Sequence, residues 1–84
     1  MVGRYRKKSS AIIEVVQFNG SNHNQLADWS AEAVGFADTL DKLEIRTLEG
    51  IMTASIGDFV VKGTEGEFYF IRKDIFEKNY EKVD

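Results

Sequence analysis

The chain has 84 residues, 43% of them hydrophobic, and no cysteine. This length suits one domain with a modest core, and the hydrophobic fraction is typical of a globular protein. Without cysteine the chain has no disulfide framework, no thiol nucleophile and no soft ligand for a structural zinc ion, so we expect a cytoplasmic location. No apolar run approaches the roughly 18 residues of a membrane helix, and we expect no membrane contact.

Basic side chains concentrate at the start of the chain, although the net charge is −3. Residues 1–10 include Arg4, Arg6, Lys7 and Lys8 and no acid. The acidic remainder disfavours a broad nucleic-acid surface. Residues 1–10 are therefore either a basic arm, which is the one candidate for nucleic-acid contact, or a first strand whose basic side chains discourage edge-to-edge pairing.

A strand is expected over Ala11–Phe18, which is rich in β-branched residues. Its apolar residues fall on both parities, so this strand is covered on both faces or contains a bulge. A helix should follow from Asn22, because Asn22 and Gln25 have the spacing of a capping box. We expect this helix to end at Gly35, a natural C-terminal stop, and to present an apolar stripe of Leu26, Trp29 and Ala33.

Four short strands separated by turn residues are expected next. They are Lys42–Leu48, Ile51–Ala54, Phe59–Lys62 and Glu67–Ile71. Because their spacing is close, the simplest pairing is a consecutive antiparallel meander. Gly57 and Gly66 lie in the connecting turns, where we expect backbone angles that favour glycine. Asp58 either accepts backbone hydrogen bonds in its turn or binds a metal with Glu65 or Glu67, and the structural interpretation is preferred.

A second helix should begin at Asp74, which forms a second capping box with Glu77. Phe76 and Tyr80 are one turn apart, so we expect both to pack against the sheet. Residues 81–84 are polar and should fray. Together these elements predict a single small α+β domain over residues 1–84. Its twisted antiparallel sheet has about five strands in a meander and packs with two helices.

No residue set amounts to a catalytic, cofactor or metal signature, so we do not expect an enzyme. His23 is the one histidine, and nothing around it suggests a nucleophile, so a surface position in the first turn of a helix is the preferred interpretation. Lys62 and Glu67 should face each other across a turn as an exposed ion pair. Tyr69 is as suited to a partner or ligand surface as to the core.

Several short sequence motifs follow one another in the second half of the chain, with one more in the first half. They are Thr47–Gly50, Met52–Ala54, Gly57–Gly63, Gly66–Tyr69, Lys73–Glu77 and Tyr80–Glu81, together with Ile13–Phe18. In these motifs the chain resembles a family of small phage and prophage proteins. The chain departs from the family pattern at Ile56, where the family has proline, and at Phe70–Lys73, where it has Pro-Cys-Lys-Pro. The resemblance implies a phage-derived protein of the bacterial cytoplasm and implies no particular activity.

Two functions follow as hypotheses. The first is a non-enzymatic accessory protein that binds a host or phage protein. The second is a small-molecule or nucleotide-binding module that uses the surface of Lys62, Glu67, Tyr69 and Lys73. An exposed apolar patch would favour the first hypothesis, and a deep pocket that converges on Tyr69 would favour the second.

Overall fold

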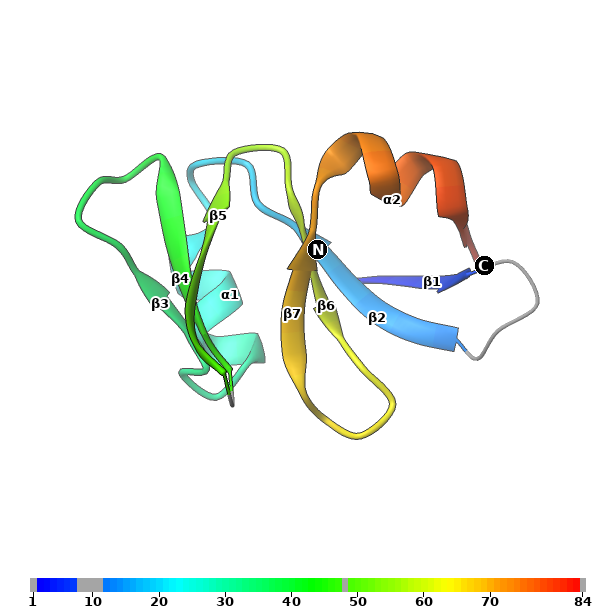
Figure 1. Cartoon of the computed structure of the whole chain (residues 1–84), viewed down its shortest axis with the longest axis horizontal. Coiled ribbons are helices and arrows are strands. Elements are labelled where there is room, and N and C mark those ends of the chain that lie inside the picture. Colours follow the sequence, from blue (N-terminus) through cyan, green and yellow to red (C-terminus); the bar gives the residue numbers. More distant parts are fainter. Residues whose placement is uncertain (1, 8–11, 48, 84) are drawn as a thin grey trace.

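The computed structural model describes residues 2–7, 12–47 and 49–83, with Lys7 described as backbone. These residues form eight strands and two helices, which confirms the α+β class (Figure 1). The elements are β1 (Gly3–Lys7), β2 (Ile12–Gln17), α1 (His23–Trp29), β3 (Val34–Phe36), β4 (Lys42–Thr47), β5 (Gly50–Ser55), β6 (Phe59–Lys62), β7 (Phe68–Ile71), α2 (Lys73–Asn79) and β8 (Tyr80–Lys82).

The strands form two antiparallel sheets. The larger sheet has the order β7-β6-β2-β1-β8, and the smaller has the order β3-β4-β5. The five-stranded sheet is confirmed, whereas the meander of four consecutive strands is wrong, because β5 and β6 belong to different sheets. Phe59, Val60 and Val61 are buried in succession, which requires a central strand covered on both faces. Strand β6 obtains this position between β2 and β7.

Strand β2 lies at the centre of the larger sheet and separates two cores. Val15 and Val16 are neighbours in sequence, yet each is only 1% exposed. Because successive side chains point to opposite faces, both faces of β2 are covered, as the sequence predicts.

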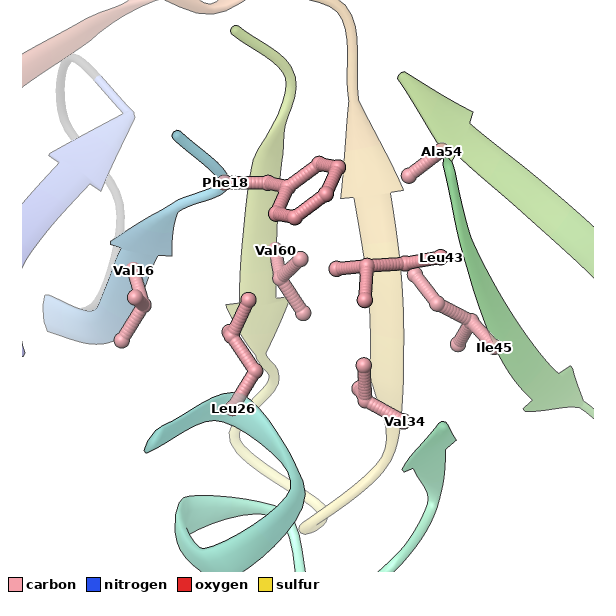
Figure 2. Packing of buried hydrophobic residues seen from close by; sticks show 8 residues of the cluster. All are labelled: Val16, Phe18, Leu26, Val34, Leu43, Ile45, Ala54 and Val60. Carbon is pink, nitrogen blue, oxygen red and sulfur yellow. The ribbon is translucent and has the colours of Figure 1, made fainter. Parts of the chain in front are cut away.

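The first core, here the aliphatic core, lies between the two sheets and is closed by α1 (Figure 2). Its buried members point toward one another from β2, α1, β3, β4, β5, β6 and the segment after β2. They are Val16, Phe18, Leu26, Val34, Leu43, Ile45, Ala54 and Val60.

The second core, here the aromatic core, lies on the other face of β2 under α2 (Figure 1). Phe76 is its centre and is 2% exposed. The Phe76 ring stacks on Phe59 at 4.0 Å and on Tyr80 at 4.6 Å, and meets the edge of Tyr5 at 4.9 Å between centroids. The predicted packing of Phe76 and Tyr80 is therefore confirmed, but Tyr80 is not on the helix as predicted, because α2 ends at Asn79 and Tyr80 begins β8. Phe68 and Phe70 instead pack against the aliphatic core.

The turns follow the glycine prediction. Gly57 and Gly66 have φ angles of +98° and +83°, which side chains with a Cβ resist. The Asp58 carboxylate accepts a hydrogen bond from the Ser55 amide at 2.9 Å, and the Asp58 amide donates to the Ser55 carbonyl at 3.0 Å. The structural interpretation of Asp58 is thus confirmed.

The first helix is shorter than predicted. It ends at Trp29, and Ala31 and Glu32 then take φ angles of +51° and +73°. The reason is tertiary, because Val34 is fully buried and opposite Ile45 on β4. Gly35 is therefore not a helix stop but a residue of β3.

Neither capping box forms. Asn22 is at the N-cap position of α1 but makes no side-chain cap. Its side chain accepts from the Asn19 amide and donates to the Gln17 carbonyl instead. In α2 the N-cap is Arg72, so Asp74 lies inside the first turn.

The chain termini differ from expectation in one respect. Gly3–Lys7 forms β1, which is the strand alternative for the basic segment, whereas residues 8–10 lie outside the described residues. Residues 81 and 82 do not fray but belong to β8, which pairs with β1. Arg6 and Glu81 join these strands by an ion pair of 2.8 Å.

Candidate functional site

The tips of the β4–β5 and β6–β7 hairpins point to the same side of the molecule (Figure 1). A groove is lined by residues of both hairpins. We call it the hairpin groove. Its volume is about 820 Å³, and it is lined by Ala33, Arg46, Thr47, Glu49, Met52, Glu65, Gly66, Glu67, Phe68 and Tyr69. Strand β4 packs against β7, so the two hairpins separate only toward their tips.

The lining of the hairpin groove is largely apolar and contains more acidic than basic side chains. Met52 comes from β5 and is 39% exposed. Phe68 comes from the opposite hairpin and meets the Trp29 ring edge-on at 5.2 Å, which fixes the Phe68 ring in place. Three glutamates and one arginine belong to the lining: Glu49, Glu65, Glu67 and Arg46. The excess of acid favours a basic or electroneutral ligand over an anion.

Glu67 is part of the β6–β7 turn. Its carboxylate accepts a hydrogen bond from the Glu65 amide at 3.0 Å, and its carbonyl accepts one from the Gly63 amide at 2.8 Å. A Cβ placed on Gly63 would lie 2.5 Å from this carboxylate. The glycine at position 63 therefore makes room for the folded-back Glu67 side chain.

Lys62 does not pair with Glu67, and the expected ion pair is wrong for these two described residues. Lys62 is opposite Phe68 on β7 and opposite Glu14 on β2. Strand alternation therefore directs Lys62 to the face of the aliphatic core. On that face the Glu14 carboxylate accepts a hydrogen bond from the Trp29 indole at 3.2 Å.

Tyr69 has the opposite orientation, because it follows Phe68 in β7 and its ring packs against the aromatic core. Burial raises the pKa of the Tyr69 hydroxyl, with smaller contributions from Tyr80 and Glu67. The hydroxyl is consequently neutral at physiological pH and acts as a hydrogen-bonding group. Tyr69 belongs to the lining of the hairpin groove, although its ring packs against the aromatic core. Lys62 does not belong to this lining.

Lys73 follows the C-terminal end of β7, whereas Lys62 and Glu67 lie at its N-terminal end. Its side chain passes near Gly57 and lines a shallow depression with Asp58, Arg72, Asp74 and Glu77. The structure thus brings Glu67 and Tyr69 to the lining of one groove, directs Lys62 to the face of the sheet opposite to that of the Tyr69 ring, and leaves Lys73 beyond the far end of β7.

His23 is buried rather than on the surface, which corrects the sequence interpretation. Its ring lies edge-on between Phe18 and Phe36, at 5.0 and 5.2 Å. The His23 Nε2 atom is 2.7 Å from the Leu40 carbonyl oxygen, so this nitrogen carries a proton and donates. These contacts tie the β3–β4 loop to α1.

Sequence reasoning missed Met52, Arg46 and Glu49 as neighbours of the β6–β7 turn. The alternation of β5 does place Met52 on the same face as the buried Ala54. The alternation therefore identifies the inner face of the β4–β5 hairpin. It does not reveal that β7 lies opposite this face.

None of the helices in the described part of the chain is long and apolar enough to cross a membrane. Within residues 2–7, 12–47 and 49–83, no group of three or more histidine, aspartate or glutamate side chains is arranged to hold a metal ion.

Comparisons with protein-family models, with curated proteins and with solved structures give no match. The resemblance to phage and prophage proteins therefore stays a prediction.

Proposed function

We propose that this protein is a phage- or prophage-derived accessory protein that acts in the bacterial cytoplasm by binding another protein, without catalysis. The hairpin groove is the observation that supports this proposal. It is open, and its lining includes Met52, Phe68 and three glutamates. The partner is a host or phage protein that inserts an apolar side chain flanked by lysine or arginine.

The wall residues suit this task for different reasons. Methionine is flexible and polarisable, so Met52 can adapt to more than one apolar side chain. Phe68 is held by Trp29, so binding costs little side-chain entropy on that wall. The excess of acidic side chains in the lining raises the association rate of basic partners and disfavours acidic ones.

The small-molecule alternative has less support. Its residues do not converge, because Lys62 and Tyr69 belong to opposite faces of the sheet. Lys73 lines a separate depression. A site for a nucleotide would also need positive charge near its phosphates, whereas the hairpin groove has an excess of acid.

A peptide-display selection on the immobilised protein tests the proposal. We expect enriched peptides with an apolar residue between basic ones. Met52→Ser should weaken binding of these peptides, and Glu65→Lys should weaken it most at low salt. Ile75→Ser is the matched control, because Ile75 on α2 is 42% exposed, close to the value for Met52. Equal loss in Met52→Ser and Ile75→Ser, or no enrichment, would contradict the proposal.

A further inference from the structure

Strand β5 has an open edge whose free backbone groups can be assigned from the register. The Arg46 amide donates to the Ala33 carbonyl at 3.0 Å, so the backbone of Arg46 faces β3. Alternation then directs the groups of Ile45 and Thr47 toward β5, where they meet Met52 and Gly50. The backbone groups of the intervening residues in β5 point away from the sheet.

The open part of this edge consists of Ile51 and Thr53. Ser55 would be the third outward residue, but Asp58 already satisfies both its amide and its carbonyl. Two amides and two carbonyls therefore remain, placed symmetrically about Met52. Strand β5, with the sequence GIMTAS, has no charge and no proline, and Ile51 is 64% exposed. Such an edge is a template for another strand.

The other described edges are protected. In β8 the edge is short and bears Glu81 and Lys82. In β3 the Val34 amide donates to the Ser30 hydroxyl at 3.0 Å. Strand β7 packs against β4, so the smaller sheet covers it. Among the described strands, β5 alone is six residues long, uncharged and open.

We propose that β5 pairs with β5 of a second copy of this chain, antiparallel and about a two-fold axis at Met52. Ile51 then lies opposite Thr53 of the partner subunit, and Thr53 lies opposite Ile51 of the partner subunit. Each pair exchanges two backbone hydrogen bonds, so the four free groups on each edge all find partners. The two three-stranded sheets become one six-stranded sheet, and this inference does not depend on the hairpin groove.

Charge complementarity favours a second copy over an unrelated strand. The Lys42 ammonium group donates to the Ser55 hydroxyl at 2.8 Å, which holds a positive charge at one end of the open edge. Glu49 precedes β5 at the other end. Antiparallel pairing brings each of these charges next to its opposite, once at each end of the interface. Asp58 is also at the Ser55 end. Its carboxylate accepts from the neutral Ser55 amide and keeps its negative charge, so it offsets part of this complementarity.

The packing of the monomer leaves room for this pairing. Strand β7 makes its close backbone contacts with β4, and Ile51 and Thr53 on the open edge of β5 are both exposed. The paired strands are short, and the interface is at the small end of the range for specific association. The dimer should accordingly be weak and concentration-dependent.

Sedimentation equilibrium on the full chain tests the proposal. We expect the mass to rise from 9.5 kDa toward twice that value with increasing concentration. Ile51→Lys and Thr53→Pro should each raise the dimer dissociation constant at least tenfold. Proline at position 53 removes an outward amide and leaves the bonds to β4 intact. Ile75→Lys, which places the same charge on α2, should leave the constant unchanged.

A charge exchange identifies the partner as a second copy. Lys42→Glu and Glu49→Lys should each weaken the dimer about tenfold, and the double variant should restore it. The matched circular dichroism spectra of all variants would show that they fold. A mass of 9.5 kDa at every concentration up to about 1 mM would overturn the proposal. An Ile51→Lys variant with the dissociation constant of the parent would also overturn it. A double variant with a higher dissociation constant than either single variant would do the same.

Discussion

The two cores on either side of β2 are built differently. The aliphatic core collects mostly branched side chains from both sheets and α1, together with Phe18, and many elements contribute to it. The aromatic core depends on stacked rings, and Phe76 is the one buried residue of α2. When one side chain of the aliphatic core is truncated, many neighbours remain in contact with one another. In the aromatic core, the contacts between α2 and the sheet depend on Phe76. The comparison implies that the two cores respond differently to truncation.

Truncation of Phe76 should have the largest effect. Phe76→Ala removes a ring that contacts Phe59, Tyr5 and Tyr80, and we expect a loss of about 3–5 kcal/mol in the free energy of unfolding. Leu26→Ala, at the equivalent buried position of α1, should cost about 2–4 kcal/mol. Urea denaturation measures both. A Phe76→Ala midpoint close to that of the parent would mean that α2 is not part of the core and acts as a separate binding element.

The link between the two cores depends on Gly57, which lies in the turn from the smaller to the larger sheet. Gly57→Ala should cost about 1–2 kcal/mol, because alanine resists the φ angle of +98°. Gly35→Ala is the control, since its φ is not positive and an added Cβ meets nothing within 4 Å. Equal denaturation midpoints for these two variants would show that the turn tolerates a side chain.

Local patterns in the sequence predicted the elements that local chemistry determines. Alternation identified β4, and glycine at positions 57 and 66 identified two turns. Neighbouring buried residues on both parities indicated that β2 is covered on both faces. These features depend on residues close in sequence, so a single chain reveals them.

Elements that depend on distant partners were missed. Strand β3 follows a helix with no glycine at its end, because pairing with β4 outweighs the strain at Ala31 and Glu32. Strand β8 is mostly polar and is ordered by pairing with β1 and by the stacking of Tyr80 on Phe76. The candidate site was also only partly predicted. Lys62 and Tyr69 were correctly placed on one hairpin, but their opposite faces and the approach of Met52 follow from the tertiary fold.

The starts of the two helices, one over each core, offer a finer test. At α1, Asn22→Ala should cost about 0.5–1.5 kcal/mol, because two hydrogen bonds to Asn19 and Gln17 are lost. Asn22→Asp distinguishes a helix-capping role of Asn22 from its hydrogen bonds to Asn19 and Gln17. Aspartate caps a helix as well as asparagine does, but it cannot donate to the Gln17 carbonyl. We expect Asn22→Asp to be destabilised in thermal denaturation at neutral pH, and a stability equal to the parent would indicate a true cap.

At α2, Asp74 should have the smallest effect. Its carboxylate accepts from the Ile75 amide at 2.9 Å and lies 3.8 Å from the Arg72 Nε atom, and both side chains are mostly exposed. An acid in the first turn interacts with the helix dipole, so Asp74→Ala should cost about 0.3–1 kcal/mol. This contribution is electrostatic and should shrink at 1 M salt, where the Debye length is about 3 Å. Asp74→Asn keeps the acceptor oxygen and removes the charge, so it should lose nearly as much as Asp74→Ala in urea denaturation at low salt. If Asp74 were instead a cap, asparagine would replace it without loss and salt would change little. That result would place the N-cap of α2 at Asp74 instead of Arg72, close to Phe76 of the aromatic core.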